Sequence, residues 1–144
     1  MSIDDHSANR IIESQLQERC IDLEKVFSAD VISLIGGIRY GVENYIREAV
    51  EAIPNKREKL AFVLETSGGY IEVAQRIVDI IRTHYSKSIA FIVPDYAMSA
   101  GTVLVMSGDE IYMDYFSILG PIDPQIENRE GRLVPALGYL IQYQ

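Results

Sequence analysis

The chain has 144 residues, of which 48% are hydrophobic, so it can form one domain with a buried core and is neither disordered nor collagen-like. Its formal net charge of −8 argues against a nucleic-acid partner, because a nucleic-acid-binding surface would be basic. Cys20 is the only cysteine, which excludes an internal disulfide, and the polar N-terminus has no signal-peptide features. These features favour a cytoplasmic protein.

The first third of the chain predicts a helix, a strand and a second helix. We expect residues 1–8 to be a loose tail and residues 9–144 to form a single domain. Apolar residues recur at helical spacing over 12–27, and this pattern places Cys20 on an apolar face that we expect in the core. A short β-branched run at 31–35 predicts a strand, and the stripe over 42–53 predicts a helix that Pro54 ends.

The remaining elements alternate. Strands are predicted at 60–64, 89–93 and 110–114, with helices at 73–85 and 99–106, a rigid loop at 120–124 and a further helix from Leu137. The apolar stretch 89–107 contains Pro94, Asp95 and Ser99, so we expect no membrane span. Strands that alternate with helices predict an α/β fold with a mostly parallel sheet.

Two turns about thirty residues apart are the most informative feature. Residues 65–70 follow one predicted strand, and residues 96–102 follow the next. Because neighbouring parallel strands end at the same edge of a sheet, we expect the two turns to meet. Gly68 and Gly69 would present bare backbone N–H groups, and Ser99 would bring a hydroxyl to the start of a helix. A hydroxyl that faces backbone donors can carry out acyl transfer.

Each turn also has a simpler interpretation. Serine commonly caps a helix N-terminus, and the segment does not match the G-x-S-x-G motif because position 97 is Ala. Gly68 and Gly69 could form a tight turn or a phosphate-binding loop, although no P-loop lysine follows. Spacing alone leaves these alternatives open.

A general base for Ser99 is hard to find in the sequence. Lys59, His84 and Lys87 fall at the amino ends of the predicted strands, and His6 falls in the tail. Near the expected site remain Glu65, Asp95, Tyr96 and Asp123, each of which can equally be a turn or loop residue; Glu65 and Asp123 are the candidate acid/base residues. No His/Cys cluster has metal-ligand spacing, so we expect no metal and no other cofactor.

Several segments together resemble the Clp-fold serine proteases. They are Ser67-Gly68-Gly69 and the runs 96–102, 109–114 and 117–125. The similarity covers roughly residues 31–126, and it is greatest to the serine dehydrogenase proteinase branch, which is related to signal peptide peptidase A and to the stomatin-type proteases.

The resemblance implies a Clp/crotonase-like spiral of ββα units that cleaves peptides or unfolded proteins and assembles as a homo-oligomer. Ser99 would be the nucleophile, and the N–H groups of Gly69 and Ala100 would form the oxyanion hole. Substrate-binding residues carried over by the resemblance are Gly68, Tyr70, Met98, Gly120, Pro121 and Ile122.

The chain departs from the family pattern at the general base. The Clp proteolytic subunit has a catalytic histidine where this chain has Ile122-Asp123, and stomatin-type relatives use a lysine near the region 135–140; this chain has neither. The base therefore lies beyond Gln144, comes from another subunit, or does not exist. In the last case the chain is a silent scaffold or a peptide-binding module. A crotonase-type acyl-CoA enzyme is a weaker alternative, because no segment resembles an adenine or phosphate site.

Overall fold

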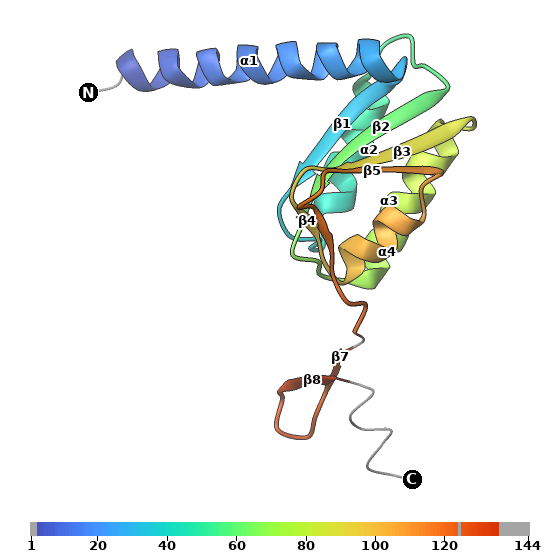
Figure 1. Cartoon of the computed structure of the whole chain (residues 1–144). Coiled ribbons are helices and arrows are strands. Elements are labelled where there is room, and N and C mark those ends of the chain that lie inside the picture. Colours follow the sequence, from blue (N-terminus) through green and yellow to red (C-terminus); the bar gives the residue numbers. More distant parts are fainter. Residues whose placement is uncertain (1–2, 124, 136–144) are drawn as a thin grey trace.

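The computed structural model describes residues 3–123 and 125–135 (Figure 1). In this part of the chain the elements follow in the order α1 (Ile3–Phe27), β1 (Asp30–Ile35), α2 (Val42–Ala52), β2 (Lys59–Glu65), α3 (Ile71–His84), β3 (Ser88–Val93), β4 (Tyr96–Ala97), α4 (Ala100–Met106), β5 (Glu110–Met113), β6 (Ile118–Leu119), β7 (Gln125–Glu127) and β8 (Leu133–Pro135).

The centre of the molecule is a parallel sheet with the strand order β1-β2-β3-β5. Both ends of each of these strands lie within one residue of the predicted bounds. The parallel α/β prediction is therefore confirmed, and its basis was the short β-branched and aromatic runs that separate the helical stripes.

One face of the sheet is buried beneath α2, α3 and α4 (Figure 1). Ile32, Phe62 and Phe91 lie in register across three strands on this face, and the two phenylalanine rings stack with centroids 5.3 Å apart. Val50 of α2 and Ile77 of α3 are fully buried against them. Each such side chain contributes about 1.5–3 kcal/mol of hydrophobic stabilisation.

The first helix differs from the expectation in two ways. It begins at Ile3, inside the predicted loose tail, because residues 3–8 contain no glycine or proline that would interrupt it. It also projects from the body of the molecule (Figure 1), so Leu16 is 61% exposed and Cys20 is only half-buried. The prediction that Cys20 lies in the core was wrong, because the helix packs on the sheet only at its last turn, where the Phe27 ring meets Tyr112 edge-on.

A smaller set of parallel pairings lies beyond the carboxyl ends of the main strands. β4 pairs with β6, and isolated bridges join Ile38 to Gly69 and Thr66 to Ala97. These pairings hold the turn after β2 beside the turn after β4, so they position the candidate site.

Farther along, β7 and β8 form an antiparallel hairpin that the sequence analysis did not anticipate. The last residue of the predicted rigid loop, position 124, and the predicted helix from Leu137 lie outside the described residues. None of the helices within the described ranges combines the length and the apolar character needed to cross a membrane.

Candidate active site

Ser99 occupies a strained turn between β4 and α4. Its backbone angles are φ 52° and ψ −120°, in a region that residues with a side chain rarely adopt. Such a conformation costs about 1–3 kcal/mol and persists only where the surrounding structure imposes it. The Ser99 hydroxyl makes no capping hydrogen bond to α4. The N-cap interpretation therefore does not explain why a serine lies here.

Two residues at the start of α4 hold this turn in place. Gly101 is buried, and a Cβ atom there would overlap the methyl group of Thr66. The buried Thr102 hydroxyl lies 2.7 Å from the Ala97 carbonyl oxygen and 3.0 Å from that of Gly120. The small residue lets α4 approach β2, while the hydroxyl ties α4 to β4 and to the segment after β6.

The glycine turn after β2 lies directly against Ser99. Gly68 has φ 97°, and a Cβ atom there would lie 2.8 Å from Ser99 Cβ and 2.7 Å from the Met98 carbonyl oxygen. The Gly68 N–H donates to Thr66 Oγ1 at 3.0 Å, which forms a local turn typical of threonine. The expected meeting of the two turns is thus present in the structure, and glycine is what permits their close approach.

Open backbone N–H groups lie next to the serine in the part of the chain that the structure describes. The residues on either side of Gly69 are both hydrogen-bonded to Ile38. The Gly68 carbonyl accepts from the Ile38 N–H, and the Tyr70 N–H donates to the Ile38 carbonyl, both at 2.9 Å. The N–H groups of Gly69 and Ala100 donate to no acceptor among the residues that the structure describes. Gly69 is exposed, so its N–H is open to solvent and can donate to a ligand oxygen.

Met98 and Gly120 form the other side of this cluster. A Cβ atom on Gly120 would lie 3.1 Å from Met98 Cα, and the Gly120 N–H donates to the Ala97 carbonyl at 3.1 Å. Pro121 and Ile122 follow along the chain and are exposed. The structure therefore gathers Gly68, Gly69, Met98, Ser99, Ala100 and Gly120, and it leaves Tyr70, Pro121 and Ile122 at the exposed rim.

None of the expected acid/base groups is bonded to Ser99. Glu65 ends β2 and Asp123 is half-buried, but within residues 3–123 and 125–135 neither carboxylate forms a hydrogen bond with the serine hydroxyl. His84 Nδ1 lies 2.9 Å from the Ile80 carbonyl oxygen, and Lys87 Nζ lies 3.6 Å from a Glu58 carboxylate oxygen. The side chain of His6 lies outside the described residues.

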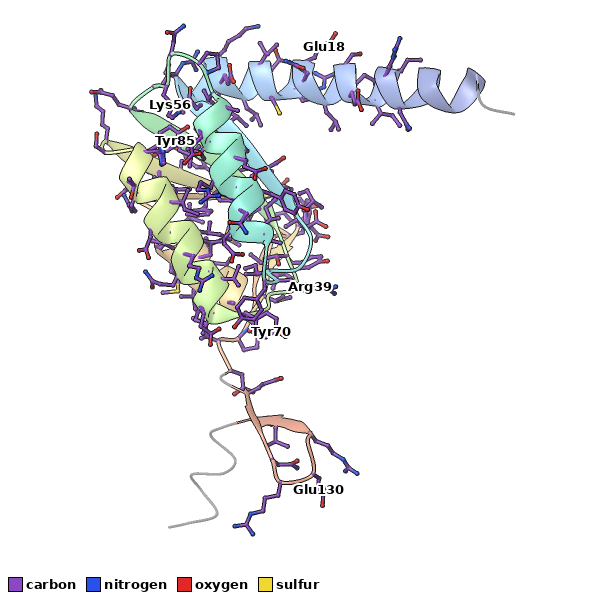
Figure 2. The ribbon with its side chains drawn as sticks, turned by 180° about the vertical axis from the view of Figure 1, so that it is seen from behind. Glu18, Arg39, Lys56, Tyr70, Tyr85 and Glu130 are labelled. Carbon is purple, nitrogen blue, oxygen red and sulfur yellow. The ribbon has the colours of Figure 1, made fainter. Side chains whose placement is uncertain are left out.

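Charged groups cluster instead at the amino ends of the strands. Figure 2 places Tyr85 and Lys56 at one end of the body and Tyr70 and Arg39 at the other. Tyr85 donates to the buried Asp30 carboxylate at 3.1 Å, and burial together with that carboxylate raises the pKa of Tyr85.

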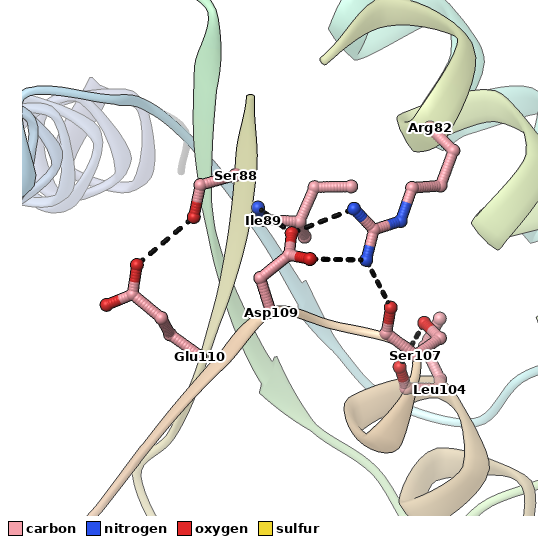
Figure 3. A network of polar contacts seen from close by, with 7 residues as sticks. All are labelled: Arg82, Ser88, Ile89, Leu104, Ser107, Asp109 and Glu110. Carbon is pink, nitrogen blue, oxygen red and sulfur yellow. Dashed lines mark hydrogen bonds and ion pairs between the residues drawn. The ribbon is translucent and has the colours of Figure 1, made fainter. Parts of the chain in front are cut away.

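A second network at this end joins α3 to β3 and to the loop before β5 (Figure 3). Arg82 binds both oxygens of Asp109, at 2.8 and 3.2 Å, and also donates to the Ser107 carbonyl. Asp109 accepts a further bond from Ile89 N–H at 2.8 Å. The hydrogen bond from Arg82 and the one from Ile89 lower the pKa of Asp109.

Sequence reasoning missed the residues that position the site, in particular Thr66, Thr102 and Ile38. Thr66 had a usable signal, because a threonine two residues before a glycine often accepts that glycine's N–H. Thr102 and Ile38 had none, since their contacts join segments that are distant in sequence.

Comparison with known proteins identifies both a family and solved structures of the same fold. A model of the ClpP-like SDH-type serine proteinases matches residues 31–136. Two Methanocaldococcus jannaschii proteins, uncharacterized protein MJ0137 and uncharacterized protein MJ1495, are 37% and 38% identical over 81 and 64 residues. These matches cover 56% and 44% of this chain but only 28% and 22% of the relatives, so the chain spans about a quarter of their length.

Two solved structures share the fold. A serine-to-alanine variant of the 1510-N membrane-bound stomatin-specific protease has a TM-score of 0.63 at 20% identity, covering 78% of this chain and 56% of that one. A lysine-to-alanine variant of this protease in complex with a substrate peptide has a TM-score of 0.62 at 22% identity, covering 78% and 53%. Because the family model spans well over half of the sequence and the fold agrees with it, the chain belongs to the ClpP-like SDH-type serine proteinases.

Proposed function

We propose that this chain is a serine peptidase that cleaves peptide bonds through an acyl-enzyme on Ser99. One observation carries the proposal: a serine in a strained strand-to-helix turn lies against glycine backbone, beside two unpaired N–H groups. Strained turns of this kind present the nucleophile in other serine hydrolases. Membership of a serine proteinase family supports the same conclusion.

The proposed reaction has two stages. Ser99 Oγ forms a bond to the scissile carbonyl carbon, the peptide C–N bond breaks, and the serine proton passes through a base to the leaving amine. Water then attacks the ester, and its proton returns to Ser99 as the acid is released. In both stages the N–H groups of Gly69 and Ala100 donate to the carbonyl oxygen as it becomes negative, and one such donor contributes about 100- to 1,000-fold in rate.

The substrate would be an extended peptide that lies between two segments of the rim. Gly68, Gly69 and Tyr70 would form one side, and Gly120, Pro121 and Ile122 the other, with Met98 at the base. Backbone pairing of this kind binds many sequences, and the side-chain pockets then add selectivity. The related protease in complex with a substrate peptide supports a peptide as ligand.

The proton acceptor is the part that the described residues do not supply. We propose that it comes from a second copy of the chain or from polypeptide outside these 144 residues. Robust turnover by the isolated chain that depends on Ser99 would instead make Glu65, Asp95 and Asp123 the first residues to mutate. Loss of the base from a serine site costs on the order of a million-fold in kcat. If the base belongs to polypeptide outside these residues, the 144-residue chain should turn over casein very slowly.

A fluorophosphonate reagent tests the proposal. We expect it to label Ser99, and Ser99→Ala to abolish the labelling. Ser67→Ala is the matched control, because Ser67 is an exposed serine on the neighbouring turn. Labelling of the intact Ser99→Ala protein at the wild-type level, detected by mass spectrometry, would contradict the assignment.

A peptide-binding module without hydrolysis is the second candidate. The observation that favours it is the absence of a histidine or lysine contact to Ser99 among the described residues. Binding of unstructured peptides without any labelling of Ser99 would support this alternative over the peptidase.

We also propose that the chain assembles as a homo-oligomer. Large apolar side chains are exposed along α1, among them Ile11, Ile12, Leu16 and Val26. Exposed apolar side chains in this number favour an interface. Sedimentation equilibrium at high micromolar concentration should give more than the monomer mass, and a pure monomer would contradict the proposal.

A further inference from the structure

Two tyrosine rings lie together at the rim of the candidate site. The ring centroids of Tyr40 and Tyr70 are 4.6 Å apart, and the ring planes are tilted by 36°. Both side chains remain largely in water, with 60% and 51% of their surfaces exposed. We call these two residues the aromatic pair. Paired rings that stay exposed contribute less to the core than buried ones and are available to a ligand.

The backbone fixes the aromatic pair beside the proposed oxyanion hole. Ile38 is fully buried, and its N–H and carbonyl bond to Gly68 and Tyr70, each at 2.9 Å. Tyr40 follows Ile38 by two residues, and Tyr70 follows Gly69 directly. The loop after β1 and the turn after β2 therefore hold Tyr40 and Tyr70 within two residues of the bridge between Ile38 and Gly69.

The rings of Tyr40 and Tyr70 can meet only when the chain is folded. Tyr40 and Tyr70 are thirty residues apart in sequence and belong to separate connections. The exposed rings of Tyr115 and Phe116 also touch, with centroids 5.2 Å apart, but sequence neighbours can meet without tertiary structure.

We propose that the aromatic pair selects an aromatic side chain of the substrate peptide. This inference rests on the proposed function. A peptide whose carbonyl oxygen accepts from the Gly69 N–H would lie close to Tyr70, because Tyr70 is the next residue in the chain. Aromatic rings attract one another beyond the effect of buried area, and tyrosine loses little conformational freedom on binding. A phenylalanine side chain can lie against both rings, whereas alanine can reach neither.

Peptide binding tests the inference without requiring turnover. The probes are fluorescent hexapeptides of alanine in which one position at a time carries Phe, Leu or Glu, and anisotropy with the full 144-residue chain gives Kd. At one position Phe should bind about tenfold more tightly than Ala, with Leu between them. Tyr70→Ala and Tyr40→Ala should each reduce this ratio to about twofold or less.

Two variants control for general damage to the rim. Tyr70→Phe keeps the ring and should keep the Phe preference, which a role for the hydroxyl would not allow. Tyr45→Ala removes a tyrosine that is 73% exposed on α2 and should leave the ratio unchanged. The inference is overturned if no position prefers Phe, if no peptide binds at millimolar concentration, or if the preference survives in both Tyr40→Ala and Tyr70→Ala.

Failure of the inference can be separated from failure of the proposed function. If the fluorophosphonate labels Ser99 while peptides show no Phe preference, the aromatic pair has no selective role and the peptidase proposal stands. If peptides show the preference but Ser99 is never labelled, the aromatic pair binds peptide in a chain that does not hydrolyse it.

Discussion

The two ends of the central sheet differ in how completely their polar groups are satisfied. At the carboxyl ends of the strands, glycine backbone contacts a strained serine, and the N–H groups of Gly69 and Ala100 have no acceptor among the described residues. At the amino ends, Asp30 and Asp109 each accept two or more hydrogen bonds. The open backbone donors beside a strained serine support the carboxyl end as the proposed ligand-binding end, while the hydrogen-bonded carboxylates of the amino end stabilise the fold.

Gly68→Ala should produce the largest effect on the carboxyl end. The new methyl group would lie 2.8 Å from Ser99 Cβ, so either the turn or the serine must shift. A displacement of about 1 Å in a reacting group costs roughly 100-fold, and we expect the rate of fluorophosphonate labelling at Ser99 to fall by that factor.

The matched control for Gly68→Ala is Gly41→Ala. Gly41 has nearly the same backbone angle, φ 99° against 97°, but a Cβ atom there meets nothing within 4 Å. Its labelling rate should stay within about twofold of the wild-type rate. Equal losses in the two variants would show that backbone strain alone, and not contact with Ser99, controls reactivity.

Thr102→Val should have the next largest effect, measured as the free energy of unfolding in urea. The substitution leaves the carbonyls of Ala97 and Gly120 without the buried hydroxyl between them. Loss of a buried donor destabilises by about 1–3 kcal/mol. Thr83→Val removes an exposed hydroxyl that also donates to a carbonyl, and it should cost less than about 0.5 kcal/mol. Equal free energies of unfolding for Thr102→Val and Thr83→Val would show that the buried hydroxyl has no special role in holding α4.

Tyr85→Phe tests the amino end and should cost about 1 kcal/mol at pH 8, because one buried hydrogen bond to Asp30 is lost. The pKa of Tyr85 is raised in the folded state, so its stabilising effect is complete below the ordinary tyrosine value of about 10 and is lost as the pH rises above it. Urea unfolding at pH 8 and pH 10.5 should therefore show a smaller alkaline loss in Tyr85→Phe than in the wild type. Tyr45→Phe, at an exposed position, should behave as the wild type does.

Asp109→Asn should have the smallest effect, about 0.5 kcal/mol at neutral pH, because the Arg82 pair is partly exposed and solvent screens it. The pKa of Asp109 is lowered in the folded state, so its contribution is present above the ordinary value near 4 and disappears as the pH falls through the lowered pKa. Thermal unfolding between pH 5 and pH 3 should show a shallower acid loss in the variant. A matching change in Asp79→Asn, an exposed aspartate of α3, would argue against a specific role for the pair.

Much of the fold followed from local pattern. The buried strands β2 and β3 are continuous apolar runs, and the stripes of α2 and α3 carry the spacing of a helix that covers a sheet. For α1 the same kind of reasoning predicted the helix correctly but did not predict that most of it would be exposed. Spacing at Ile12 and Leu16 indicates an apolar face, yet it contains no information about which surface, if any, lies opposite.

For the site, the sequence predicted the meeting of the two turns but not the state of Ser99. The motif that usually identifies a strained serine turn is missing, because Ala97 stands where that motif has glycine. The serine instead lies against Gly68, which comes from another strand connection, and this contact has no local sequence signal. Tyr40 was overlooked for a related reason, since only the bridge between Ile38 and Gly69 brings it to the rim.

The projecting helix also affects how the size of the molecule is measured. At 1.5 Å per residue, the 25 residues of α1 extend roughly 37 Å, about the diameter of a compact domain with as many residues as this chain. Such a shape increases the hydrodynamic radius and slows rotational tumbling relative to a sphere of equal mass. A monomer will therefore elute from a gel-filtration column calibrated with compact proteins at the volume of a larger species.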